Sequence, residues 1–249
     1  MTFGEEPMQE NTSTIELICN HTSVRDYEDR EVEPEVREKI IDAARHASTT
    51  CFFQVTSVIR VSDPEKRKAI ADITTQPHVY KAPELWIFCA DFTRVKAVCP
   101  NADTGFLEQF LYGVLDTGLF AQNAMIALES LGLGGVYAGA IRRDIARIAE
   151  VLELPATAVP VVGICFGYPA CKNEPKPRFP SHMLLMDNVY REPSEEDLKH
   201  YDEITRQYFA SRGANAKESS WSREISKIFS REQRAHLLGF LRARGWCQK

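Results

Sequence analysis

The chain has 249 residues, of which 44% are hydrophobic and 26% are charged, as is usual for one large or two small globular domains. Its net charge of −5 argues against non-specific binding of nucleic acid, which needs a basic face that displaces counterions. Seven cysteines without a Cys-x-x-Cys pair and six histidines without an HExxH motif indicate free thiols in a reducing compartment and no zinc site.

The two segments most relevant to targeting are the N-terminus and the most apolar run. Residues 1–13 are polar and acidic, so we expect a flexible tail and not a signal peptide. The run over 158–170 is too short and too rich in glycine and proline to cross a bilayer. We therefore expect a cytoplasmic protein with no membrane partner and no nucleic-acid partner.

The segment 20–27, "NHTSVRDY", gathers His21, Thr22, Ser23 and Arg25 in a chain that is acidic overall. Hydroxyl groups and a guanidinium at this density suit the oxygen atoms of a bound phosphate. The alternative is a helix N-terminus at which Thr22 or Ser23 caps the helix and Arg25 is solvated. The residues alone leave both interpretations open.

The next part of the chain predicts a helix, a strand, a second helix and a second strand. Residues 34–47 open with proline and carry apolar side chains at helical spacing. Residues 52–63 and 84–92 have the β-branched and apolar density of strands. A helix over about 65–74 is expected to connect them.

Residues 105–131 form the longest helical pattern, about 40 Å if fully helical. The apolar side chains cover more than one stripe of this helix. A helix that is apolar on most sides is expected to be buried on most sides. We therefore expect a central helix that packs on a sheet and on a partner subunit.

The glycine-rich segment 132–140, "GLGGVYAGA", follows a helix and leads into a strand. A dinucleotide-binding fingerprint has the opposite order, so we expect a tight turn and a buried strand over 135–141 instead. A helix over 143–154 and a strand within 159–169 follow. The remainder contains only helical patterns, near 195–211, 222–229 and 231–244. We expect a mixed α and β protein with one domain over 14–249 and a helical extension over 187–249.

The segment 174–179, "EPKPRF", contains a second pair of cations. Its two prolines fix the backbone and hold Lys176 and Arg178 on the same side of an extended segment, because side chains alternate. A solvated loop is an equally good interpretation. Combined with residues 21–25, the segment offers a second cationic arm for one phosphate.

From about Thr14 to its C-terminus, the chain resembles the FMN-dependent, oxygen-insensitive NADPH nitroreductases and the related NADPH flavin reductases. The resemblance is carried, in this order, by "TIELICNHTSVR", "LYGVLDTGLFAQNAMIALESLGLGGVYAGAIR", "KPR" and "YFASRGAN…W". It implies an α+β fold with a central, mainly antiparallel sheet flanked by helices and a long central dimerisation helix. It also implies a homodimer with FMN in clefts between the subunits and a helical extension that completes the active site.

The resemblance further implies the residues of the site. Those matched to flavin binding are His21, Thr22, Ser23, Arg25, Thr49, Thr50, Cys51, Gln76, His78, Tyr137, Ala138, Gly139, Ala140, Lys176 and Arg178. Those matched to NADPH or substrate binding are Cys51, Phe52, Arg142, Arg212, Lys217 and Arg234. Arg25 and Lys176 are the candidates for stabilising the reduced flavin. No catalytic triad, carboxylate pair or metal is expected, because the cofactor carries the reaction.

Three positions depart from the family pattern. Thr22 stands where arginine is usual, which removes one charge from the phosphate site. Cys51 stands where serine is usual and places a thiol near the flavin. Lys217 stands where arginine is common, and lysine lacks the planar fork of a guanidinium, so NADPH is expected and NADH is possible.

The activity that the resemblance implies is hydride transfer from NADPH to FMN, followed by two-electron reduction of nitroaromatics, quinones or similar small molecules. One alternative is a flavin reductase that supplies reduced FMN to a partner. A second is a flavin-binding protein with little turnover, and a third is a basic helix over 234–246 that binds nucleic acid.

Overall fold

The computed structural model describes residues 13–171 and 173–249, so residues 1–12 of the predicted tail lie outside the described part. The chain divides into two compact units, each described by itself. The sheet unit contains the described residues up to Asn173 together with His236–Lys249. The helical unit is Glu174–Ala235. The expected single domain over 14–249 stays a prediction.

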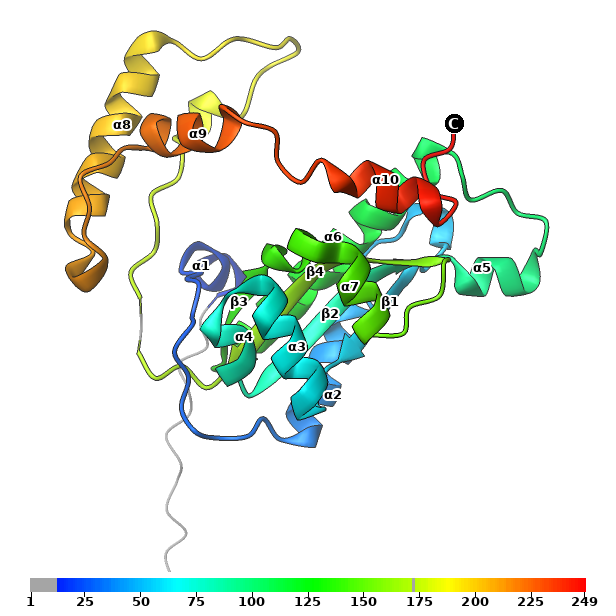
Figure 1. Ribbon diagram of the computed structural model, residues 1–249. Coiled ribbons are helices and arrows are strands. Elements are labelled where there is room, and N and C mark those ends of the chain that lie inside the picture. The colour runs from blue at the N-terminus through cyan, green and yellow to red at the C-terminus, as the bar shows by residue number, and fades with distance from the viewer. Residues whose placement is uncertain (1–12, 172) are drawn as a thin grey trace, which may run out of the picture. The chain divides into compact units, whose positions relative to one another are not determined.

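The sheet unit is built on one four-stranded sheet with the strand order β1-β2-β4-β3. The strands are β1 (Thr56–Arg60), β2 (Glu84–Asp91), β3 (Gly134–Ala138) and β4 (Ala158–Gly167). Every neighbouring pair is antiparallel, which confirms the predicted mainly antiparallel sheet. Every residue of the central strand β2 is buried, since helices cover both faces (Figure 1).

The period-two alternation of β2 separates the two faces. Leu85, Ile87 and Cys89 pack with α3 (Pro64–Thr74), α4 (Pro77–Lys81) and α7 (Ile145–Val151). Trp86 and Phe88 pack on the opposite face with α2 (Pro34–Ala44) and α6 (Leu107–Ser130). Figure 1 shows α3, α4 and α7 in front of the sheet. The helices predicted over 34–47 and 65–74 are therefore confirmed, and α4 is an additional short helix.

The long helix α6 is buried along one side only. Its buried residues are Gly113, Asp116, Thr117, Ala121, Ala124, Met125 and Leu128. Leu107, Leu111, Leu115 and Leu119 recur every four residues, and all four are exposed. Within this single chain one leucine stripe has no cover among the described residues, so the expected packing on a partner subunit stays a prediction.

Helix α1 (Thr14–Cys19) begins with a capping box, in which Ser13 and Glu16 each bond the other's backbone N–H. Because the next helix after α1 begins only at Pro34, the interpretation of Thr22 or Ser23 as a helix N-cap is wrong. The remaining helices of the unit are α5 (Thr93–Val98) and α10 (His236–Ala243). The predicted helix over 231–244 therefore begins later than expected.

The helical unit has no strand among its described residues and is held by aromatic rings. It contains η3 (Ser181–Met183), α8 (Glu195–Ala210), η4 (Gly213–Asn215) and α9 (Trp221–Phe229). The ring of Phe179 lies 4.1 Å from that of Tyr201 and 5.0 Å from that of Trp221, measured between centroids. The helices predicted near 195–211 and 222–229 are confirmed.

None of the helices in the described part of the chain combines the length and the apolar character that crossing a membrane requires.

Candidate functional site

Residues 21–27 lie along the outer edge of β3. Ser23 forms a parallel bridge with Gly135, and the N–H of Val24 donates to the carbonyl of Gly135 at 3.0 Å. A second bridge joins Tyr27 to Pro169. The segment therefore extends the sheet, and its hydroxyl and cationic side chains are carried on a supported edge.

Two glycines make this close docking possible. A Cβ on Gly134 would lie 2.5 Å from Cγ2 of Val24, which is closer than atoms approach each other. A Cβ on Gly135 would lie 3.0 Å from Sδ of Met125 on α6. The glycine-rich segment is thus a turn and a buried strand, as predicted. The missing side chain of Gly134 admits the segment 21–27, and that of Gly135 leaves room for Met125.

His21 faces α6. Its Nδ1 lies 2.6 Å from Oε1 of Glu129, and the Glu129 side chain is only 12% exposed. Burial raises the pKa of Glu129, while the bond to His21 acts in the opposite direction. The sequence analysis did not include Glu129, although it is a charged residue near the end of an apolar helix.

Arg25 lies near α4, on the opposite face of the sheet from α6. Its side chain is exposed and forms no hydrogen bond or ion pair with any described residue. Burial lowers the pKa of His78, and the positive charge of Arg25 lowers it further. Arg25 and His78 are therefore neighbours.

Two buried atoms beside Arg25 lack hydrogen-bond partners among the described residues: Oε1 of Gln76 and Nε2 of His78. Such orphaned atoms are rare in folded proteins and indicate a place for a ligand. A flavin offers N–H and carbonyl groups along its ring edge, and a phosphate suits Arg25 and the hydroxyls of residues 22 and 23. These residues fit flavin mononucleotide.

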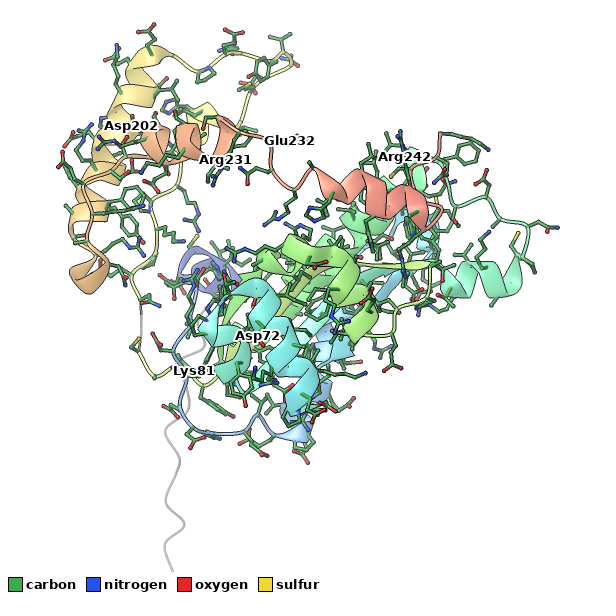
Figure 2. All side chains as sticks on the ribbon, viewed as in Figure 1. Asp72, Lys81, Asp202, Arg231, Glu232 and Arg242 are labelled. Atoms are coloured by element: carbon green, nitrogen blue, oxygen red, sulfur yellow. The ribbon has the colours of Figure 1, made fainter. Side chains whose placement is uncertain are left out.

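A surface pocket of about 610 Å³ lies next to Gln76, between α3 and α4. Asp72 and Lys81, both labelled in Figure 2, are among the residues that line it. The pocket leaves the start of α4 accessible from outside.

Tyr137 points from β3 toward α6. Its hydroxyl donates to Oε1 of Gln122 at 3.0 Å, and burial together with the charge of Glu129 raises its pKa. The ring remains about one-third exposed (36%), so it is accessible to a flat ligand at the strand edge.

The strand β3 is shorter than predicted. It ends at Ala138, and the chain continues into the 3₁₀ segment η2 (Gly139–Asp144), which includes Ala140. Arg142 in this segment donates to the carbonyl of Val161. The arginine is therefore tied to β4, and its predicted contact with substrate stays a prediction.

Thr49, Thr50 and Cys51 form a tight turn before β1. The hydroxyl of Thr49 donates to Asp116 at 2.5 Å, and the N–H and hydroxyl of Thr50 donate to the same carboxylate at 3.0 and 2.9 Å. Asp116 is buried on α6, with 3% of its surface exposed. This carboxylate was not predicted, although an acid within an apolar helical pattern is a usable signal.

The turn has an unusual backbone. Cys51, Phe52 and Gln54 have φ values of 46°, 62° and 52°, in the left-handed region that side chains disfavour. The strand predicted over 52–63 therefore starts only at Thr56. Cys51 and Phe52 are exposed at the tip of the turn.

The turn 49–51 and the segment 21–25 lie at opposite corners of the sheet. Thr56 pairs with Ala90 at one end of β2, whereas Gly135 pairs through β4 with the end at Glu84. With standard strand spacing and rise, the two corners are roughly 25 Å apart. One chain thus places residues 21–25, Gln76, His78 and Tyr137 at one edge of the sheet, with His21 and Tyr137 toward α6 and Arg25 and His78 toward α4, and it keeps the turn at the opposite corner.

The other predicted cations lie in the helical unit, where their position relative to the sheet unit stays a prediction. Arg178 donates to the carbonyls of Lys176 and Pro177. The ammonium of Lys217 lies 2.6 Å from Glu224, whose pKa is lowered to about 2, mainly by that hydrogen bond. Lys217 is therefore neutralised by a neighbour in this structure.

Arg212 and Arg234 occupy irregular segments of the same unit. The guanidinium of Arg212 lies 5.8 Å from the centre of the Tyr208 ring. Arg234 has a φ of 54° in the connection before α10. The contacts of Arg212 and Arg234 with NADPH therefore stay predictions.

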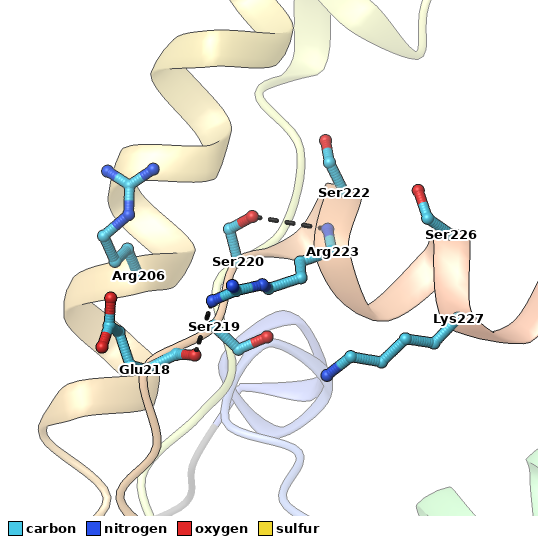
Figure 3. A pocket seen from close by; sticks show the side chains of 8 residues that line it. All are labelled: Arg206, Glu218, Ser219, Ser220, Ser222, Arg223, Ser226 and Lys227. Carbon is cyan, nitrogen blue, oxygen red and sulfur yellow. Dashed lines mark hydrogen bonds between the residues drawn. The ribbon is translucent and has the colours of Figure 1, made fainter.

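A pocket of about 660 Å³ in the helical unit was not predicted. Figure 3 shows the cations that line it, Arg206, Arg223 and Lys227, among serine hydroxyls. Each cation already has a protein partner: Glu203 for Arg206, the carbonyl of Glu218 for Arg223, and Glu224 for Lys227. The pocket is polar, and the three cations that line it are all paired within the helical unit.

The antiparallel sheet, the segment 21–27 at its edge and the helical unit can be compared with known protein families. Residues 18–168 match the model of the nitroreductase family, and residues 176–249 match the C-terminal domain of the nitroreductase family. The chain belongs to the nitroreductase family.

Individual relatives are similar over nearly the whole chain. An oxygen-insensitive NADPH nitroreductase of Salmonella typhimurium is 43% identical over 237 residues, covering 95% of this chain and 99% of the relative. An NADPH-flavin oxidoreductase of Vibrio harveyi is 38% identical, with 95% and 99% covered.

Solved structures have the same fold. The NADPH:FMN oxidoreductase of Vibrio harveyi, in complex with NAD+, superposes with a TM-score of 0.89 at 35% identity, covering 95% of this chain and 99% of that one. Nitroreductase A of Vibrio parahaemolyticus gives 0.91 at 35% identity, with 96% and 99% covered. The predicted nitroreductase fold is confirmed.

Proposed function

We propose that this protein is an FMN-dependent oxidoreductase that uses NADPH to reduce nitroaromatics, quinones or similar small acceptors by two electrons. The observation that carries the proposal is the group of Arg25, Gln76 and His78, in which an unpaired cation lies beside two orphaned buried polar atoms. The near full-length similarity to NADPH-dependent relatives supports the same conclusion.

FMN, when bound, would take a hydride from NADPH and pass two electrons to the acceptor. The protein's own residues bind and orient. Gln76 would accept a hydrogen bond from the flavin edge, and Ser23 and Thr22 would offer hydroxyls to the phosphate. Arg25 places a positive charge next to the ring, where it favours added negative charge.

The proposal includes a homodimer. The exposed leucine stripe of α6 is an apolar surface that a second copy of the chain would bury. A two-fold axis would also bring the turn 49–51 of one subunit to residues 21–25 of its partner, which the distance of roughly 25 Å prevents within one chain. Cys51 and Phe52 would then lie at the partner's flavin.

The helical unit supplies the remaining binding residues in this proposal. Lys176 and Arg178 would form the second cationic arm at the phosphate. Arg212, Lys217 and Arg234 would receive the anionic part of NADPH, and Lys217 would exchange its contact with Glu224 for the ligand. A cytoplasmic location belongs to the same proposal.

A second candidate function is a flavin reductase that releases reduced FMN to a partner. The 38% identity to an NADPH-flavin oxidoreductase favours it. Thr22 is compatible with this candidate, because a missing cation weakens the hold on the phosphate and eases release.

An absorbance spectrum of the purified protein, titrated with NADPH under nitrogen, tests the proposal. We expect a yellow protein, or one that turns yellow with added FMN, and bleaching by NADPH without an acceptor. A colourless protein that ignores FMN would refute the proposal. Steady-state rates with nitrofurazone and with free FMN as acceptors distinguish the two candidate functions.

A further inference from the structure

We infer that Glu129 is a positioning residue, which holds the imidazole of His21 so that the second ring nitrogen is left to donate to the phosphate of FMN. The inference rests on the proposed function and deepens it. It concerns a carboxylate on α6 that the sequence analysis did not include.

The contact is short and sheltered. Nδ1 of His21 and Oε1 of Glu129 are 2.6 Å apart, a distance typical of a charge-assisted hydrogen bond. The side chains are 27% and 12% exposed, so water competes weakly for either partner. A carboxylate sheltered to this degree needs a partner, and among the described residues His21 is its only ion-pair partner.

The position of Glu129 near the C-terminus of α6 also favours a positively charged partner. Glu129 is the residue before Ser130, the last residue of the helix, so it lies at the negative end of the helix dipole. That end disfavours a carboxylate and favours a positive charge. An imidazolium at residue 21 therefore interacts favourably with both the carboxylate and the helix end, and Tyr137 is the other titratable group whose pKa responds to Glu129.

The arrangement fixes which nitrogen faces the ligand. In the proposed arrangement Glu129 accepts a hydrogen bond from Nδ1, which keeps the ring from rotating freely. Nε2 has no hydrogen-bond partner among the described residues. With a phosphate oxygen at Nε2, both nitrogens donate, and the positively charged ring lies between two anions.

The substitution at residue 22 makes this contact more important here. Thr22 provides a hydroxyl but no charge, so residues 21 and 25 are the cationic donors that the segment 21–25 can supply. The contribution of His21 to phosphate binding is then a larger part of the total than it would be beside an arginine.

The test compares FMN with riboflavin, which has the same ring system but no phosphate. Dissociation constants of both are measured by flavin fluorescence for the wild type, for Glu129→Gln and for Glu150→Gln. Glu150→Gln is the matched control, because it makes the same change in an exposed pair with Arg147. We expect Glu129→Gln to weaken FMN about 10-fold and to leave riboflavin within about 2-fold.

A double-mutant cycle with His21→Gln shows whether the effect passes through the histidine. We expect Glu129→Gln to have little further effect on FMN binding in the His21→Gln background. Glu129→Asp, which keeps the charge but shortens the side chain, replaces Glu129→Gln if that variant does not fold. We expect it to weaken FMN selectively as well.

The outcomes are distinct. Equal weakening of FMN and riboflavin, no weakening of FMN, or independent effects in the cycle would each overturn the role of Glu129 while leaving the proposed function intact. A wild type that binds neither flavin would refute the proposed function itself and this inference with it.

Discussion

Thr50 and Asp116 are bound to each other through both the N–H and the hydroxyl of the threonine, across 66 positions of sequence. The bond attaches the left-handed turn before β1 to the middle of α6. The same helix holds His21 through Glu129, 13 residues further along, which corresponds to about 20 Å. A single helix thus positions both corners of the candidate site.

Replacing Asp116 should loosen this turn. Asp116→Asn removes the charge from a carboxylate that accepts hydrogen bonds from Thr49 and Thr50, so we expect the free energy of unfolding to fall by about 2 kcal/mol. Urea denaturation measures the change. Asp42→Asn, in an exposed pair with Arg45, is the control and should change stability by less than about 0.5 kcal/mol. Equal stability of the two variants would contradict the role of Asp116.

Adding a side chain at Gly134 should displace the segment 21–27. The new Cβ of Gly134→Ala would lie 2.5 Å from the side chain of Val24, so the bridge between Ser23 and Gly135 cannot persist unchanged. We expect FMN binding to weaken by at least about 10-fold, measured by fluorescence, because the segment carries the proposed phosphate contacts.

Gly239→Ala is the control for that experiment. Gly239 lies within α10 and its added Cβ meets nothing within 4 Å. Alanine in a helix interior is expected to be neutral or to stabilise by about 0.5–1 kcal/mol. Unchanged FMN affinity of Gly134→Ala would show that the segment is not needed in its docked position.

A charge in the leucine stripe of α6 should prevent dimer formation. Leu115 is 59% exposed in the single chain, and we expect Leu115→Glu to sediment as a monomer where the wild type sediments as a dimer. Leu238→Glu, at an exposed position of α10 outside the stripe, should leave the sedimentation of the protein unchanged. A wild type that sediments as a monomer would refute the predicted dimer.

The thiols should react in two groups. Cys19, Cys51, Cys99 and Cys171 are exposed, whereas Cys89 and Cys165 are buried and burial raises the pKa of each to about 12. At pH 8 the thiol reagent DTNB should modify the exposed group in the folded protein and the buried pair only after unfolding. Cys99→Ser should reduce the fast phase by one thiol, and fast labelling of Cys89 would contradict the structure.

The sequence predicted the sheet and the long helix well, because their signals are local and strong. The apolar residues of β2 and the helical spacing in 34–47 and 105–131 indicate their structures without knowledge of distant contacts. The short helices α4 and α5 were missed, because five or six residues give no clear period. The strand predicted over 52–63 was wrong at its start, since Asp116 holds residues 49 and 50 in a turn from 66 positions away.

The binding roles of the predicted site residues stay predictions, although the structure places Arg25 beside His78. The pairing of residue 23 with Gly135 explains the glycine-rich strand in physical terms. Glu129 and Asp116 were missed, because neither has a local partner and their roles depend on packing between α6 and distant loops. The exposed leucine stripe of α6 shows that apolarity alone does not say whether a side chain is covered by its own chain or by a partner.

The diagonal separation of the two corners has a consequence for handling the protein. If each flavin site takes residues from both copies, dissociation of the dimer on dilution releases FMN, and the protein then loses its bound flavin without any reductant. Gel filtration at decreasing protein concentration, with absorbance recorded at 280 nm and at about 450 nm, tests this. The protein peak should lose its flavin absorbance at the concentration at which the dimer dissociates.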